Sequence, residues 1–210
     1  MKKSNQRLGA SDNGFTLIEL LMVISIIAVV AAILQPLVVS SKKSAKRTTC
    51  QSNLRQIGLA HILYGDDWDD RYPWAIDQFT RASPEAMSDF PPPHDLIPDK
   101  VSLLSSYMGR NGQIWRCPMD YSSFKYPPND QTTSKTYDSV FEFARTSYVF
   151  VSERRVAGKS HTIFESSQLQ LCRDAVLWHC DYEEPSIFTK SHNIVYGDGH
   201  VKFTTQMDGS

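Results

Sequence analysis

The chain has 210 residues, of which 22 are Lys or Arg and 23 are Asp or Glu, and its formal net charge at pH 7 is −1. This total conceals two different parts. Residues 1–64 hold eight basic and two acidic residues, whereas residues 65–210 hold 14 basic and 21 acidic ones. Neither part has a basic patch with interleaved aromatic residues, so the composition excludes a nucleic-acid-binding module.

An apolar run extends from Phe15 to Val39 and contains one charged residue, Glu19. A helix over these residues would be about 37 Å long, enough to cross the ~30 Å hydrocarbon core of a bilayer. A signal peptide fits poorly, because its apolar segment rarely exceeds about 15 residues and a small-residue cleavage site follows it. The sequence therefore predicts a membrane span. A carboxylate inside a span is costly, which makes Glu19 a functional candidate; the alternative is that it snorkels at the membrane interface.

The helix is predicted to continue beyond the span to about residue 64. Apolar and aromatic side chains recur there at spacings of three and four, which places them on one helical face. They are Cys50, Leu54, Ile57, His61 and Tyr64. We expect a sheet to cover this face, His61 to be a hydrogen-bonded core residue rather than a ligand, and the helix to end near Gly65.

Residues 65–210 are predicted to form one globular head. Ten of the 11 prolines lie in this part, so much of it should be irregular. An Asp-Gly pair at 198–199, flanked by strand-forming residues, predicts a hairpin within 193–203. Further strands are expected at 113–117, 146–152 and 175–180, and a short helix at 101–108.

The segment GFTLIELLMVISIIAVVAAIL at 14–34 resembles the N-terminus of type IV pilins and type II secretion pseudopilins. The resemblance implies that a prepilin peptidase cleaves between Gly14 and Phe15 and that the new N-terminal Phe15 is methylated. It also implies that Glu19 pairs with Phe15 of a neighbouring subunit and so sets the register of assembly. Pro36 lies where this family often has a helix-kinking proline.

The resemblance further implies an α+β, pilin-like fold, in which a long N-terminal transmembrane helix packs against a small antiparallel sheet. The expected divisions are a leader (1–14), a transmembrane helix (15–39), its periplasmic continuation (40–64) and a globular head (65–210). Expected partners are the prepilin peptidase, other pilin or pseudopilin subunits, an inner-membrane assembly platform and membrane lipid. Basic residues flank both ends of the span, so charge alone does not orient it; the resemblance places the head outside the inner membrane.

Four further segments resemble motifs of one branch of pilin-like proteins, which has a C-terminal His followed by Asp-Gly. In this chain His192 precedes Asp198 by fewer residues than that branch has, so a role for His192 does not carry over. The four segments are SNLRQIG at 52–58, YGDDWDDRYP at 64–73, WRCPMD at 115–120 and GDGHVKF at 197–203.

Four cysteines suit an exported domain in which disulfides persist. Their positions favour a Cys50–Cys117 bridge between the helix and the head, and a local Cys172–Cys180 bridge; four reduced, buried thiols are the alternative.

No cofactor is expected, with Ca²⁺ as a secondary possibility. Asp66, Asp67, Asp69 and Asp70 crowd oxygen ligands into five residues, although the spacing of an EF-hand loop is absent. The sequence also lacks a nucleophile elbow, a phosphate-binding glycine loop and a zinc-protease motif, so no enzymatic activity is expected.

Two functions remain open from the sequence. The first is a structural subunit of a pilus or pseudopilus, for type IV pilus formation or type II protein secretion. The second is a membrane-tethered module that binds a polysaccharide or a protein without polymerising. Trp68, Tyr72 and Trp74 would suit sugar stacking in the second case.

Overall fold

The structure is a computed structural model of the whole chain. It describes residues 15–83, 87–88, 90, 92–109, 111–121, 123–126, 135–151, 153–161, 165–175 and 192–204. The chain divides into two compact units, residues 1–42 and 43–210, and the boundary falls within the first helix.

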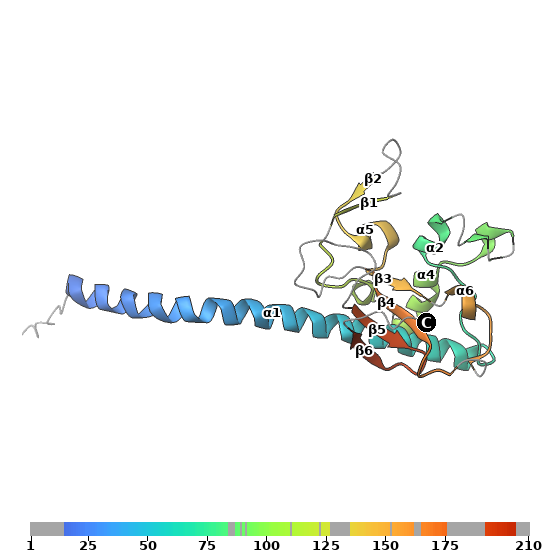
Figure 1. The fold of residues 1–210 in the computed structure, drawn as a ribbon, viewed down its shortest axis with the longest axis horizontal. Helices are drawn as coiled ribbons and strands as arrows, with labels where there is room; N and C mark the ends of the chain where they lie inside the picture. The colour runs from blue at the N-terminus through green and yellow to red at the C-terminus, as the bar shows by residue number, and fades with distance from the viewer. Residues whose placement is uncertain are drawn as a thin grey trace, which may run out of the picture. The chain divides into compact units, whose positions relative to one another are not determined.

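Helix α1 is a single element of 51 residues, Leu17–Asp67, with Pro36 inside it (Figure 1). It ends two residues later than predicted. The backbone N–H groups of Trp68 and Asp70 both donate to the carbonyl of Gly65, at 3.1 and 2.9 Å, and these bonds close the last turn.

Within residues 17–39 the side chains of the large apolar residues are exposed, and this part of α1 is long and apolar enough to cross a membrane. No residue of its most apolar stretch is buried. Because exposed apolar surface of this extent is unfavourable in water, the segment needs lipid or other chains around it.

The second unit contains a four-stranded antiparallel sheet in the order β3-β4-β5-β6. A separate two-stranded sheet pairs β1 with β2. The strands are β1 (Phe124–Tyr126), β2 (Lys135–Tyr137), β3 (Tyr148–Phe150), β4 (Gln170–Asp174), β5 (His192–Tyr196) and β6 (Val201–Thr204). The long helix and this sheet together give the predicted α+β, pilin-like layout.

Short helices fill the irregular connections, as the many prolines suggested. They are α2 (Gln78–Ala82), α4 (Lys100–Ser105), α5 (Val140–Ala144), α6 (Glu153–Val156) and the 3₁₀ turns η1 (His94–Leu96), η2 (Ser106–Met108) and η3 (Gly112–Trp115).

Two of the strand predictions need correction. The expected strand at 113–117 is instead η3, because the Asn111 side chain accepts a hydrogen bond from the Gln113 N–H and starts a helical turn. Of the strand expected at 175–180, only Ala175 is described and it lies outside any strand; the actual strand β4 comes just before it. The predicted hairpin is confirmed, since β5 and β6 pair on either side of Asp198 and Gly199.

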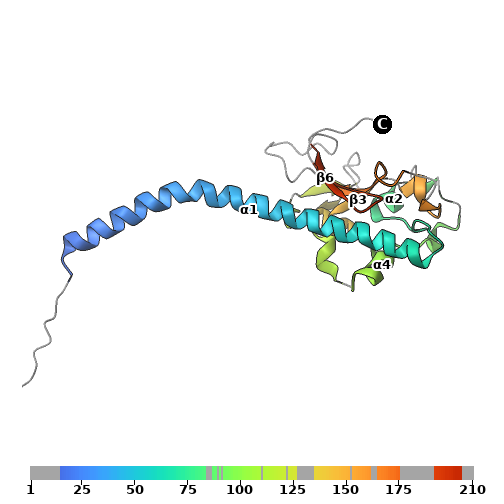
Figure 2. The same ribbon diagram turned by 90° about the horizontal axis from the view of Figure 1, so that it is seen from below.

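The outer part of α1 packs against β5 and the β5–β6 turn (Figure 1). Gly58 makes the approach possible, since a Cβ placed there would lie 2.6 Å from Val195 Cγ2 and 3.3 Å from the Gly199 Cα. Cys50, Leu54 and Ile57 on this face are fully buried, as their spacing predicted. Figure 2 shows β6 and α4 on opposite sides of α1, so the helix is covered from two directions.

Candidate functional site

The candidate assembly segment begins at Phe15, and its first helical turn is closed by two side chains. The Thr16 N–H and the Thr16 hydroxyl donate to the Glu19 carboxylate, at 2.8 and 2.7 Å. In return the Glu19 N–H donates to the Thr16 hydroxyl oxygen, at 3.3 Å. This reciprocal arrangement is a capping box, which satisfies backbone donors that a helix N-terminus leaves unpaired.

The charge and the apolar surface of this segment lie next to each other. Glu19 places a negative charge in the first turn, where the helix dipole favours an anion. The Phe15 side chain is 85% exposed, so the described chain leaves this ring uncovered. Gly14, the residue expected before the cleavage site, lies outside the described residues.

The sequence of this segment matches a known family model. Residues 10–34 match the prokaryotic N-terminal methylation motif. The start of the chain therefore has the methylation motif that its apolar segment suggested. The match includes Gly14, Phe15 and Glu19 and implies processing of the prepilin type. No curated protein and no solved structure matches this chain, so the role of the head has to be argued from its own geometry.

A disulfide joins Cys50 of α1 to Cys117 in the segment after η3, with the two Cα atoms 5.3 Å apart. These are the two cysteines that their positions in the sequence favoured. Next to the bridge, the side-chain amide of Asn53 donates to the Arg116 carbonyl at 3.1 Å and to the Tyr148 hydroxyl at 3.2 Å. The first strand of the sheet and the disulfide segment are therefore both tied to α1.

The expected Cys172–Cys180 bridge is not what the structure contains. Cys172 is a free thiol on β4 and is completely buried, and burial raises the pKa of this thiol well above its usual value. Its Sγ lies 4.0 Å from the Arg173 carbonyl oxygen. Cys180 lies outside the described residues.

The four segments that resemble pilin-like motifs meet around α1. Asn53 and Gly58 of the first segment contact the third segment and the β5–β6 turn, as described above. Tyr72 of the second segment is buried, and a Cβ added at Gly197 of the fourth would lie 2.9 Å from the Tyr72 hydroxyl. Asp120 of the third is buried and accepts hydrogen bonds from Val140 N–H, Phe141 N–H and the Ser147 hydroxyl, at 2.9, 2.8 and 2.6 Å. These motifs therefore build the interior of the head.

Three histidines, on α1, on β5 and just before β6, differ in their burial. His61 is buried, and its Nδ1 lies 2.9 Å from the Ile57 carbonyl oxygen, which confirms the prediction of a hydrogen-bonded core residue. Burial, and then the nearby Lys100, lower the pKa of His61 to about 3. His192 begins β5 and is also buried; burial and Arg173 lower its pKa. His200 is exposed and its Nδ1 lies 2.6 Å from Asp198 Oδ1.

The acidic turn at the end of α1 is exposed to solvent. Asp66, Asp67, Asp69 and Asp70 are all exposed, and Asp69 and Asp70 have positive φ angles of 52° and 56°. Among the described residues, no group of three or more His, Cys, Asp or Glu is placed to hold a metal ion. Asp70 instead lies 3.5 Å from His161 Nδ1. Calcium binding by this turn stays an untested prediction.

The aromatic residues beside this turn are not one exposed platform. Tyr72 is buried, which makes the expectation of sugar stacking on it wrong. Trp68 is 57% exposed and stacks on Tyr64, with ring centroids 5.7 Å apart. Trp74 packs edge-on against Phe90.

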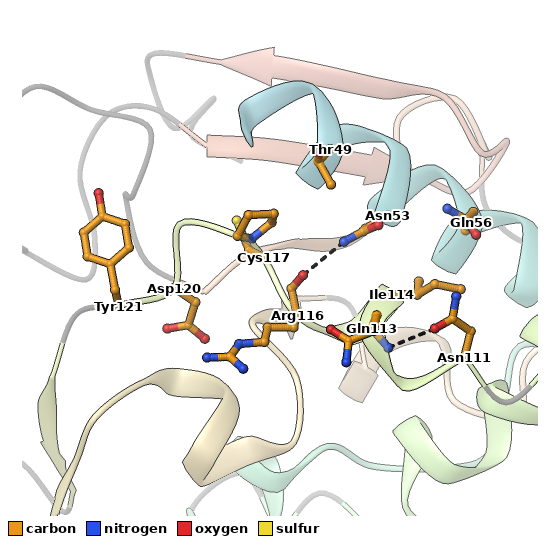
Figure 3. A pocket seen from close by; sticks show the side chains of 11 residues that line it. Thr49, Asn53, Gln56, Asn111, Gln113, Ile114, Arg116, Cys117, Asp120 and Tyr121 are labelled. Carbon is orange, nitrogen blue, oxygen red and sulfur yellow. Dashed lines mark hydrogen bonds between the residues drawn. The ribbon is translucent and has the colours of Figure 1, made fainter. Parts of the chain in front are cut away.

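A polar pocket of about 550 Å³ lies between α1 and the segment that carries η3 and Cys117 (Figure 3). Five of its eleven lining residues have amide or aliphatic hydroxyl side chains, and the wall also contains one guanidinium and one carboxylate. The lining residues are Thr49, Asn53, Gln56, Asn111, Gln113, Ile114, Arg116, Cys117, Pro118, Asp120 and Tyr121. Sequence reasoning missed this pocket, because its two walls are brought together by the fold and share no local motif.

Proposed function

We propose that the mature chain begins at Phe15 and is a non-catalytic structural subunit of a pilus or pseudopilus. The observation that carries the proposal is the methylation motif over residues 10–34 on a helix whose apolar side chains are uncovered. Lipid covers these side chains before assembly, and the same segments of neighbouring subunits cover them afterwards. Apolar packing along this stretch supplies the free energy of association.

Glu19 sets the register of the subunits through an exchange of partners. In the single chain its carboxylate caps its own helix through Thr16. In the polymer it turns to the charged amine of Phe15 on a neighbouring chain. A charge pair in a low dielectric is strongly coupled, because removal of one partner leaves the other uncompensated. Each incoming subunit is therefore held at one position along the helix.

The proposed location is the inner membrane, with a single span and the head on the periplasmic or extracellular side. Prepilin peptidase removes the leader on the cytoplasmic side, and an inner-membrane assembly platform adds the processed chain to the polymer. The proposal covers type IV pili and type II secretion pseudopili alike.

The deciding experiment is the intact mass and N-terminal sequence of the protein purified from its native membrane. A chain that starts at methylated Phe15 supports the proposal. A chain that starts at Met1 overturns it, because an uncleaved leader leaves no amine at Phe15.

A second candidate function, a tethered binding module, is favoured by the polar pocket. Amide and hydroxyl side chains such as Gln56, Gln113 and Thr49 are suited to the hydroxyl groups of a polysaccharide, and the exposed ring of Tyr121 offers a stacking surface. The test is retention of the purified chain on immobilised neutral and acidic polysaccharides, with Gln56→Ala/Gln113→Ala as the pocket variant and Gln168→Ala as the control. Retention that only the pocket variant loses supports this function; no retention on any polymer counts against it.

A further inference from the structure

Four cations, the first of them Lys42, follow the apolar segment of α1 within a few residues of its end. Lys43, Lys46 and Arg47 come four, seven and eight positions after Val39. At about 1.5 Å per residue they lie roughly 6, 10 and 12 Å along the helix from Val39. The polar layer on each side of a bilayer core is about 5–8 Å thick, and long basic side chains reach back toward it.

Two of these cations lie over aromatic rings that come from two separate segments of the head. Lys46 Nζ lies 5.6 Å from the centroid of the Tyr121 ring, and Arg47 Cζ lies 4.7 Å from the centroid of the Phe203 ring. The Tyr121 side chain follows the disulfide segment and is 66% exposed, whereas Phe203 is on strand β6. We call these five residues (Lys43, Lys46, Arg47, Tyr121 and Phe203) the collar.

A collar of this composition matches the chemistry of a membrane surface. Aromatic side chains with one polar end are enriched at the level of the headgroups, and cations there attract anionic lipids. The head as a whole should be repelled by an anionic membrane surface, because residues 65–210 contain seven more acidic than basic residues. The collar, formed by α1 and two aromatic residues of the head, is thus the region that suits contact with such a surface.

We propose that the collar binds the headgroups of anionic phospholipids. The three cations pair with phosphate groups, and the Tyr121 and Phe203 rings lie at the level of the headgroups. This contact holds the base of the head against the outer surface of the membrane before the subunit is assembled. The proposal rests on the membrane orientation given under Proposed function, but it requires no assembly.

The test is electron spin resonance on the full chain reconstituted in bilayers, with spin-labelled phosphatidylglycerol compared with spin-labelled phosphatidylcholine. The fraction of each lipid that the protein immobilises gives its relative affinity. A cation at the membrane surface contributes about 1 kcal/mol toward anionic lipid, so one engaged cation predicts about fivefold selectivity for phosphatidylglycerol. The selectivity should fall as salt rises from 0.1 to 1 M, because salt screens the pairing.

The collar variant is Lys43→Gln/Lys46→Gln/Arg47→Gln, and the control variant is Arg55→Gln/Lys135→Gln/Lys159→Gln. Both remove three charges, and Lys135 of the control also stands over an aromatic ring, that of Tyr137. Only the collar variant is expected to lose the selectivity. If it fails to fold, the single variants Lys43→Gln and Arg47→Gln are compared with Arg55→Gln, and only the first two are expected to lower the selectivity.

Two results would overturn the proposal. One is an unmodified chain that immobilises both lipids equally. The other is selectivity that the collar variant keeps while crosslinking between copies falls, which would show that the cations contact the acidic turn of another subunit. Failure of the assembly proposal looks different, because a chain that never polymerises can still select lipid.

Discussion

Gly58 of α1 lies so close to Val195 of β5 that a Cβ at position 58 would stand 2.6 Å from Val195 Cγ2. The Gly199 backbone limits movement on the same side, with its Cα 3.3 Å from that Cβ position. The helix and the sheet are thus in contact at a point where no side chain fits. Since overpacking a well-packed interior typically costs about 1–3 kcal/mol, Gly58→Ala should lower the free energy of unfolding of the head by that amount.

The measurement for Gly58→Ala is urea unfolding of the full chain in detergent, followed by tryptophan fluorescence. Gly112→Ala is the matched control, because a Cβ at Gly112 meets nothing within 4 Å. The control should unfold at the same urea concentration as the unmodified chain or a slightly higher one. Equal midpoints for the two variants would mean that helix and sheet can separate without cost.

Removing the Cys50–Cys117 disulfide should destabilise the head strongly. The two cysteines are 67 positions apart, and a loop of that length corresponds to about 4 kcal/mol in the chain-entropy model. Cys50→Ser/Cys117→Ser is expected to lower the free energy of unfolding by about that amount.

In the unmodified chain, alkylation under native conditions should leave Cys172 unlabelled, because its thiol is completely buried. Unfolding without reductant should make this thiol accessible to the reagent. Native labelling of Cys172 would contradict the structure.

The buried His61 should make the head less stable in acid. Its folded pKa, about 3, lies below the ordinary value of 6.5, so the unfolded state binds more protons between these pH values. The free energy of unfolding therefore keeps its full value above about pH 6.5. As the pH drops from there toward 3, it decreases by up to about 1.4 kcal/mol per pH unit. When the free energy of unfolding is measured with urea at pH 4.5, 5.5 and 7.5, it should depend less on pH for His61→Leu than for the unmodified chain. Gln168→Ala, which removes no titratable group, should leave this pH dependence unchanged.

Three substitutions separate the charge of Glu19 from its capping role. Glu19→Gln keeps the capping box and loses the charge, Thr16→Ala loses the box and keeps the charge, and Glu19→Ala loses both. If the charge sets the register, only Thr16→Ala should assemble when filaments are counted by electron microscopy of cells that contain each variant. Membrane insertion should be intact in all three. Filaments from Glu19→Gln would show that capping, and not pairing with Phe15, is what the carboxylate provides.

Asp120 should be more important for stability than its position in a loop suggests. Its carboxylate accepts two hydrogen bonds from backbone N–H groups at the start of α5 and one from the Ser147 hydroxyl, just before β3. Hydrogen bonds to a charged group contribute more than neutral ones, so Asp120→Asn should cost about 1–3 kcal/mol. Asp138→Asn, at an exposed position nearby, should cost almost nothing in the same unfolding assay. Similar values for both would mean that the charge of Asp120 is dispensable.

The sequence predicted those parts of the structure that depend on a local pattern. The buried face of α1 follows from the spacing of Cys50, Leu54 and Ile57, and the β5–β6 hairpin follows from Asp198 and Gly199. Position alone favoured the Cys50–Cys117 pair, since one cysteine is on the helix and the other lies in the head.

Elements fixed by distant contacts were missed. Strand β4 contains polar residues that look unsuited to a core, yet Asp174 is buried because the N–H and the side-chain amide of Asn193 both donate to it at 2.8 Å. The 3₁₀ turn η3 replaces an expected strand because Asn111 caps it and the Trp115 indole donates to the Ser105 hydroxyl at 2.9 Å. The contacts with Asn193 and with Ser105 join residues that are far apart in the sequence, so the residues of each element alone do not predict them.

The disulfide also decides what happens when the chain is pulled lengthwise. A force that enters at the start of α1 and leaves through the strands of the sheet passes from Cys50 to Cys117 through a covalent bond. The residues between these cysteines are bypassed and carry no load. Fully extended they would add about 220 Å of length, which the crosslink withholds. The head can therefore lengthen only through the part of the chain after Cys117. Reduction of the disulfide would allow the segment between the two cysteines to extend as well.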